Sequence, residues 1–175
     1  MPSKLLLDYL QRTGAQYQQV QHPLTFTAAQ LAEYAHLNGS SLAKVTMVKL
    51  DNELAMVVLP ASHTVHCDLL ANALMVAKVE VAHEKDFGHR FPRCALGAIP
   101  PFGHLFGVTA YMMPIFDEYS SIAFNAGSHT EMIIMPFREY ERVAHVDTVP
   151  RGVVPPSWSN VCELGSVHRR LLRSH

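Results

Sequence analysis

Residues 43–59 have the sequence AKVTMVKLDNELAMVVL, which decides the fold class of this chain. The runs 43–50 and 53–59 are rich in aliphatic and β-branched residues, and they flank Asp51 and Asn52, which tolerate the positive φ of a tight turn. The second run is apolar almost throughout, which is typical of a strand in a central position. The sequence therefore predicts a β-hairpin whose second strand lies inside a sheet.

Helices and strands follow one another irregularly around this hairpin. We expect helices over residues 3–12, 27–37, 67–75 and 137–143, a helical turn over 83–89, and further strands over 17–21, 78–81, 108–113, 121–125 and 131–136. There is no regular strand–helix–strand repeat. The pattern predicts an α+β fold, with a curved, mixed and largely antiparallel sheet that is barrel-like and flanked by helices.

Length and composition fit one folded domain. The chain has 175 residues, of which 49% are hydrophobic and 17% charged, enough to bury a sizeable core. At Asp147 the composition changes and prolines begin to interrupt every regular pattern. We therefore expect a domain over residues 1–146 and a C-terminal extension over 147–175 that packs on the surface or contacts a partner.

Several classes of protein are excluded by what the sequence lacks. No apolar run approaches the roughly 18 residues of a membrane span, and Asp8 interrupts an N-terminal apolar stretch too short for a signal peptide. The three cysteines, Cys67, Cys94 and Cys162, are scattered and odd in number, so we expect no disulfide framework and a cytoplasmic location.

The net charge is −1 with the histidines neutral, which is not the basic balance of a protein that grips long duplex nucleic acid. A nucleic-acid partner would have to be held locally, by a few cations and a pocket. The basic cluster over residues 168–175 is interpreted as a solvated helix end.

Residues 96–103, LGAIPPFG, combine two glycines with two adjacent prolines and cannot form a helix or a central strand. Such a loop could be the floor of a small-ligand pocket, or a hydrophobic turn that joins two core elements.

Polar residues in three other segments are candidates for chemistry. Lys44 could hold a phosphate or polarise a carbonyl, or could simply extend to solvent. In residues 124–130, FNAGSHT, Gly127 and Ser128 could offer N–H groups to an oxyanion, with His129 as donor or proton carrier. The alternative is an ordinary turn. In residues 22–27, Thr27 is explained as a helix N-cap.

A metal site is only weakly indicated. His63, His66 and Cys67 have spacings that place ligands on one helix face, but no further histidine-rich motif stands nearby in the sequence, and we predict neither a metal nor a cofactor. The sequence has no nucleophile elbow, phosphate loop or dinucleotide fingerprint.

Taken in order, these segments resemble the YbaK/ProX family of aminoacyl-tRNA editing domains. The similar stretches are residues 22–28, 42–48, 57–63, 97–103 and 124–130, so that the resemblance covers about residues 1–145. It implies a single α+β domain that hydrolyses the ester between a wrong amino acid and a tRNA 3′ end. It also implies that Lys44 contacts the terminal adenosine or its phosphate and the substrate carbonyl, that residues 97–101 line the aminoacyl pocket, and that Gly127 lies beside the substrate.

The predicted function is therefore that of a deacylase acting in trans on the acceptor end of mischarged tRNA. We assign catalysis to Lys44, Gly127, Ser128 and His129, and substrate binding to His22, Thr25, Gly97, Ile99, Pro100, Pro101 and Phe102. An ester needs only an oriented water and a stabilised oxyanion, so no nucleophile–base pair is required. The apolar loop over 99–102 would exclude larger side chains, as a sieve.

Two alternatives stay open: a non-catalytic tRNA- or nucleotide-binding or regulatory module on the same fold, and a metal-dependent hydrolase. The sequence does not specify the amino acid removed, the tRNA or the oligomeric state, and a homodimer is possible.

Overall fold

The predicted hairpin is present and organises the larger of two main sheets. The computed structural model describes residues 3–24, 28–116 and 120–155. Strands β2 (Ala43–Leu50) and β3 (Glu53–Pro60) pair along their whole length, and both turn residues have positive φ, 48° at Asp51 and 79° at Asn52. Strand β3 has a strand on each side and is buried from Ala55 to Pro60, so the expected central position is confirmed.

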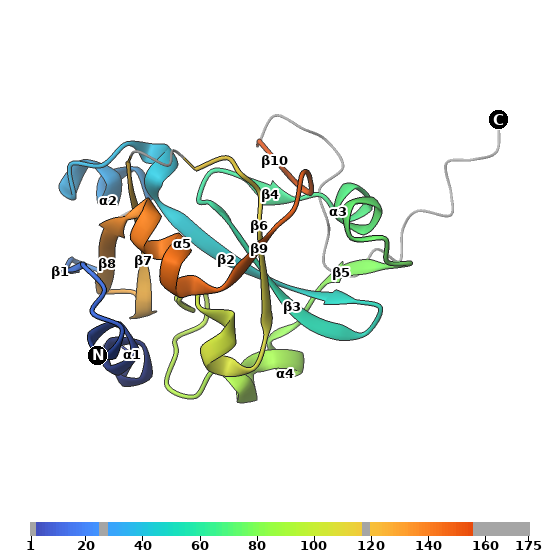
Figure 1. Cartoon of the computed structure of the whole chain (residues 1–175), viewed down its shortest axis with the longest axis horizontal. Coiled ribbons are helices and arrows are strands. Elements are labelled where there is room, and N and C mark those ends of the chain that lie inside the picture. Colours follow the sequence, from blue (N-terminus) through green and yellow to red (C-terminus); the bar gives the residue numbers. More distant parts are fainter. Residues whose placement is uncertain (1–2, 25–27, 117–119, 156–175) are drawn as a thin grey trace.

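This sheet has five strands in the order β5-β2-β3-β6-β9 (Figure 1). Strand β5 (Val79–Val81) is antiparallel to β2, whereas β6 (Thr109–Met112) and β9 (Val146–Thr148) continue the sheet in parallel. The chain between β3 and β6 forms β4 (Thr64–Val65), the helices α3 (Cys67–Leu74) and α4 (Glu84–Phe87), and the 3₁₀ turns η2 (Gly88–Arg90) and η3 (Gly103–Phe106).

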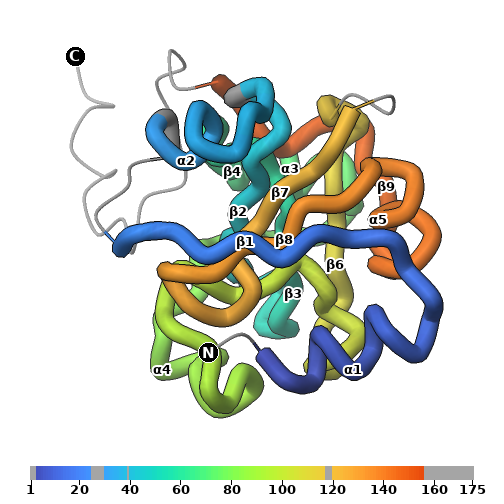
Figure 2. Tube along the Cα trace, turned by 90° about the vertical axis from the view of Figure 1, so that its left-hand side faces the viewer, coloured from blue at the N-terminus to red at the C-terminus, as the bar shows by residue number. Residues whose placement is uncertain are grey.

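The second sheet is antiparallel and has three strands, in the order β1-β8-β7. Its strands are β1 (Gln18–Gln21), β7 (Ser121–Ser128) and β8 (Glu131–Pro136), which run side by side in Figure 2 with α1 (Lys4–Arg12) beneath them. Helices α2 (Ala28–Tyr34) and α5 (Phe137–Ala144) flank this sheet, and η1 (Gly39–Ser41) leads into β2. A single parallel bridge, Leu42 to Ala123, connects β2 with β7.

The α+β class and the single mixed fold are confirmed, but the sheet is not one curved surface. The described residues form two main sheets and a two-stranded pair of β4 with β10 (Val153–Val154), and they close no barrel. The largest core lies between the main sheets and α1. It contains an aromatic group in which Phe102 meets Phe124 at 5.5 Å and Tyr140 at 5.5 Å between ring centroids.

The first residues beyond position 146 take part in both sheet and core. Asp147 and Thr148 pair with β6, while Val149 and Val153 are buried in a second core with Leu70 of α3. The rest of the predicted extension from residue 156, including Cys162 and the basic cluster, lies outside the described residues, as does the predicted cap Thr27. No helix in the part of the chain that the structure describes is long and apolar enough to cross a membrane.

Candidate functional site

Four of the polar residues in the segments singled out from the sequence surround one cavity of about 320 Å³. Its described lining residues are His22, Leu24, Leu31, Leu42, Ala43, Lys44, Ala61, Asn125 and His129. A volume of this size is at the small end for ligand pockets, which hold about 300–1,000 Å³.

The bridge between the two sheets explains why Lys44 and Asn125 meet. Leu42 and Ala123 lie opposite each other in a parallel arrangement. Side chains two residues further along a strand return to the same face. Lys44 and Asn125 are each two residues further on, so β2 and β7 deliver both of them to the same side.

Lys44 supplies the positive charge of the cavity. Its side chain is half-buried, and burial lowers the pKa of its ammonium. None of the described lining residues is a carboxylate. The pKa of His63 is also lowered. Burial of the imidazole is the larger cause, and the positive charge of Lys44 is the second. An ammonium held without a carboxylate partner is suited to an anionic or carbonyl oxygen.

His22 is buried beside this charge, with 6% of its surface exposed. Its main-chain N–H donates to the carbonyl of Thr130 at 2.8 Å, which fixes the segment before α2 against β8. Its Nδ1 lies 3.1 Å from the carbonyl oxygen of Pro23, while Nε2 has no hydrogen-bond partner. The Oδ1 atom of Asn125 is also buried without a partner. Such groups are rare in native structures, because leaving one unpaired costs about 1–3 kcal/mol.

His129 connects the cavity to the predicted glycine–proline loop. Its Nε2 lies 2.6 Å from the carbonyl oxygen of Leu96, and because a carbonyl only accepts, Nε2 carries the proton and Nδ1 the lone pair. Gly97 lies directly against the ring: a Cβ there would be 3.4 Å from Cε1 of His129, and Gly97 has a φ of +78°. The two segments are thus brought together.

Gly127 holds the loop rather than offering a free donor. It lies at an irregularity of β7, between Asn125 and Ser128, with a φ of +101°. Its N–H donates to Ala98 at 2.9 Å and its carbonyl accepts from Ala95 at 2.8 Å. The N–H of Gly127 expected at an oxyanion is therefore already bonded in this structure.

Ser128 also has partners of its own. Its hydroxyl donates to Glu131 Oε2 at 3.2 Å and lies 3.4 Å from the hydroxyl of Thr130. Neither Ser128 nor Gly127 lines the cavity.

The apolar part of the loop contributes to the core more than to the cavity. Phe102 is fully buried among aromatic rings, and Pro100 and Pro101 are buried as well. The hydroxyl of Tyr140 donates to the carbonyl of Pro101 at 2.9 Å. Ile99 is half-buried against the same core. The expected wall of residues 99–102 is absent from the described lining, which uses leucines of other segments instead.

The remaining expectations concern Thr25 and the metal site. Thr25 lies outside the described residues. His66 accepts a hydrogen bond from the N–H of Leu69 and so caps α3, Cys67 is disulfide-bonded, and Cys94 is a free thiol. The sequence predicted no disulfide framework, and Cys67 departs from that expectation. The described residues contain no cluster of three side chains able to hold a metal ion.

Sequence reasoning missed Asn125, although the residue gave a signal. It is the one amide within the otherwise apolar or small run of residues 122–127. The apolar lining from Leu31 and Leu42 gave no such signal, since both residues equally fit a core.

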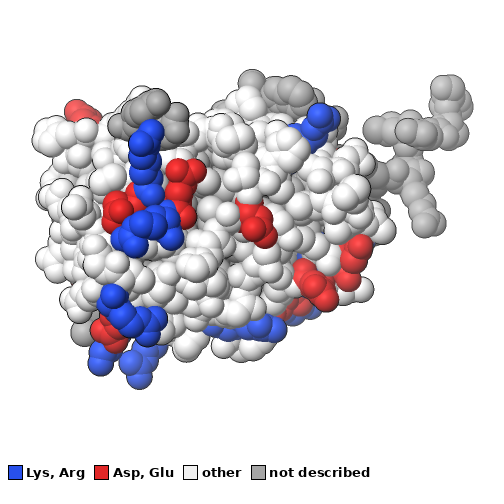
Figure 3. All heavy atoms as spheres, viewed as in Figure 1, with Lys and Arg blue, Asp and Glu red and all other residues white. Residues whose placement is uncertain are grey.

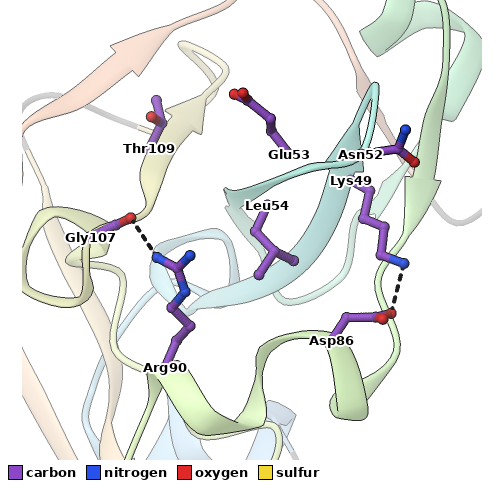
Figure 4. Close-up of a pocket in the computed structure, with 8 residues that line it drawn as sticks. All are labelled: Lys49, Asn52, Glu53, Leu54, Asp86, Arg90, Gly107 and Thr109. Carbon is purple, nitrogen blue, oxygen red and sulfur yellow. Dashed lines mark hydrogen bonds and ion pairs between the residues drawn. The ribbon is translucent and has the colours of Figure 1, made fainter.

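A second hollow of about 560 Å³ lies at the other end of the hairpin (Figure 4). There Lys49 points to Asp86, with Nζ 3.0 Å from Oδ2, and Arg90 donates to the carbonyl of Gly107 at 3.3 Å. These charges are already satisfied, whereas the cavity at Lys44 has unpaired acceptors. The cavity at Lys44 is therefore the better candidate for a ligand site.

Comparison with known proteins identifies the family of this chain. The family model described as "Aminoacyl-tRNA editing domain" matches residues 22–143. The multifunctional Ser/Thr-tRNA deacylase ProXp-y of Escherichia coli (strain K12) is 25% identical over 152 residues, which cover 82% of this chain and 89% of that protein.

Two solved structures have the same fold. A proposed trans-editing enzyme for prolyl-tRNA synthetase superposes with a TM-score of 0.72 at 14% identity, over 85% of this chain and 96% of that one. A hypothetical protein, APE2540, superposes with a TM-score of 0.69 at 14% identity, over 83% of this chain and 99% of that one.

The fold and cavity define a small α+β domain with a cationic, partly apolar pocket for a small polar ligand. This chain belongs to the family of aminoacyl-tRNA editing domains, as the matched span shows. The resemblance to the YbaK/ProX family is thereby confirmed, and with it the expected class of enzyme, an aminoacyl-tRNA deacylase.

Proposed function

We propose that this chain acts in trans in the cytoplasm, and that the cavity at Lys44 binds the ester-linked end of mischarged tRNA and hydrolyses it. The observation that carries the proposal is the convergence of Lys44, His22, Asn125 and His129, from three separate segments, on one cavity. Seryl and threonyl esters are the first candidates, because the relative of 25% identity is named for serine and threonine.

In the proposed mechanism, the Lys44 ammonium binds the carbonyl oxygen or the adjacent phosphate and stabilises the negative charge that develops during water attack. His129 donates through Nε2 to Leu96, so Nδ1 is left to accept a proton from the attacking water as the water oxygen bonds to the carbonyl carbon. The same Nδ1 then returns the proton to the ribose oxygen as the ester C–O bond breaks. The products are the free amino acid and the tRNA with its ribose hydroxyl restored. Gly127 and Gly97 act by fixing the position of the loop and the His129 ring.

We propose that cations outside the cavity hold the acceptor stem. A hollow of about 880 Å³ is lined by Ser3, Lys4, Leu5, Arg90, Pro92, Arg93, Leu105 and Phe106. Ser3 also lies against Gly127, 3.2 Å from where a Cβ would be. On the face shown in Figure 3, charged side chains form small groups, some with both signs adjoining and others of one sign, separated by wide uncharged areas. A few local contacts to phosphate fit this surface better than a continuous basic face does.

The experiment compares hydrolysis of seryl-, threonyl-, alanyl- and cysteinyl-tRNA by the parent and by Lys44→Ala. Removing one group that stabilises an oxyanion typically costs about 10²–10³-fold in rate, and a loss of that order is expected here. Lys49→Ala is the matched control, because Lys49 lies on the same strand and is paired with Asp86.

Full activity of Lys44→Ala would contradict the proposal, and so would a metal requirement revealed by loss of activity with a chelator. Tight binding of an aminoacyl-adenosine analogue without turnover by the parent would favour the non-catalytic module instead.

A further inference from the structure

Two buried hydrogen-bond acceptors without partners line the cavity, and they are the least explained atoms of the site. They are Nε2 of His22 and Oδ1 of Asn125. His22 is 94% buried, since only 6% of its surface is exposed. Each unpaired group would cost about 1–3 kcal/mol unless a bound molecule supplied the missing donor. The pair therefore indicates what kind of ligand completes the site.

The protonation of His22 follows from its neighbour. Nδ1 lies 3.1 Å from the carbonyl oxygen of Pro23, which can only accept, so Nδ1 carries the proton. In the neutral ring Nε2 is then an acceptor. The amide of Asn125 contributes the acceptor Oδ1 and also an NH₂ donor. A hydroxyl donates one hydrogen bond and can accept others, so a ligand hydroxyl can donate to one of these two acceptors and accept from the NH₂ group of Asn125.

A neutral donor fits this cavity better than a second cation. The Lys44 ammonium lines the same space, and no described lining residue is a carboxylate that could pair with a cationic side chain. The leucines at positions 24, 31 and 42 enclose the remainder with apolar surface. A short side chain that carries one hydroxyl matches this combination of two polar atoms and an apolar wall.

We infer that His22 and Asn125 form a hydroxyl-recognition pair that selects aminoacyl esters with a hydroxyl side chain over those without one. The inference rests on the proposed function, and it assigns specificity to these two residues while the chemistry stays with Lys44 and His129. A site built to bind a hydroxyl rejects the analogue that lacks it, because a buried acceptor is then left unpaired. Alanyl esters are close in size to seryl esters but lack the hydroxyl.

The test measures kcat/KM for seryl- and alanyl-esters of one tRNA. The parent is expected to prefer the seryl ester by at least about 100-fold. His22→Phe and Asn125→Leu, which keep the bulk without the acceptor, are expected to lower seryl hydrolysis by about 10–100-fold and to change alanyl hydrolysis less than about threefold. His22→Gln retains an acceptor and should keep more of the seryl preference than His22→Phe does.

His89→Phe is the control, because His89 is exposed on η2 and lies outside the cavity lining. It should leave both rates unchanged. The parent's own ratio needs no variant and so does not depend on how well a variant folds. A parent that hydrolyses both esters equally, or variants in which both rates fall together, would overturn the inference and leave the proposed function in place. A parent that hydrolyses no ester would overturn both.

Discussion

Lys44 illustrates how a functional side chain differs from a stabilising one. Burial disfavours its charged form, and the resulting fall in pKa is not offset by a carboxylate among the described lining residues. Groups that bind substrate are often unfavourable for the stability of the free protein. Replacing Lys44 should therefore separate stability from activity.

We predict that Lys44→Met unfolds at a temperature at or above that of the parent at pH 7, while deacylation is lost. With its pKa lowered in the folded state, Lys44 binds fewer protons there than in the unfolded chain between the lowered value and 10.5. The parent's stability therefore rises with pH across that window. Thermal unfolding measured from pH 7 to 10.5 should show that the difference in unfolding temperature between the parent and Lys44→Met decreases as the pH rises. A variant markedly less stable than the parent at pH 7 would contradict this account of Lys44.

The pKa of His63 depends on the charge of Lys44. Burial is the larger cause of its lowered pKa, and the positive charge of Lys44 is the second. Lys44→Met removes only the second, so the pKa of His63 should rise in the variant and stay below its ordinary value. An NMR titration of the histidine ring signals measures this. An equal pKa of His63 in the parent and in Lys44→Met would contradict the electrostatic effect of Lys44 on His63.

At the scale of elements, the bend in β7 positions the loop. Gly127 has a φ of +101°, and a Cβ there would lie 3.2 Å from both N and Cβ of Ser3. The main chain of Gly127 exchanges hydrogen bonds with Ala95 and Ala98, and Leu96 between them holds His129. A substitution that shifts the main chain at Gly127 should therefore shift residues 95–98 and, with them, the ring of His129.

We predict that Gly127→Ala lowers the free energy of unfolding by about 2–3 kcal/mol and reduces kcat, because both strain and a close contact are introduced. Gly14→Ala is the matched control: Gly14 also has positive φ, +62°, but a Cβ there meets nothing within 4 Å. It should cost about 1 kcal/mol and leave kcat unchanged. Denaturant unfolding and single-turnover kinetics test both. An equal kcat in Gly127→Ala and Gly14→Ala would show that the main-chain shift at Gly127 does not displace His129.

The sequence predicts a helix or strand correctly where neighbouring residues alone determine it. The hairpin was predictable because Asp51 and Asn52 separate two strand-forming runs, and β8 because residues 131–136 are nearly all apolar. The strands β4, β9 and β10 have two or three residues each and depend on their partners, so no local pattern indicates them. The role of Phe102 also required the structure: an apolar residue beside prolines fits a pocket wall and a core equally well.

The candidate site was predicted only in part, because local sequence patterns indicate some of its residues and not their partners. Lys44, His22 and His129 were recognisable as polar residues next to structural breaks, and the structure brings them to one cavity. That Gly127 and Ser128 are already bonded could not be foreseen, because their partners Ala98 and Glu131 are set by the loop and by strand register. Asn125 reaches the cavity only through the bridge between β2 and β7.

At the scale of the whole molecule, two sheets joined by one bridge place the cavity at their junction. The five-stranded sheet supplies Lys44, and the three-stranded sheet with its turn supplies Asn125 and His129. This cavity and the hollow at Lys49 and Asp86 lie toward opposite ends of the hairpin, since Lys44 pairs with Leu59 and Lys49 pairs with Leu54. A ligand bound at one hollow can therefore be told from a ligand bound at the other.

The most direct measurement is a crystal structure of the chain with a non-hydrolysable seryl-adenosine analogue, in which an amide replaces the ester. The account predicts that the analogue occupies the cavity between β2 and β7, with its carbonyl oxygen at the Lys44 ammonium and its side-chain hydroxyl between His22 and Asn125. An analogue bound at the hollow of Lys49 and Asp86, or bound with Lys44 directed away from it, would contradict the account.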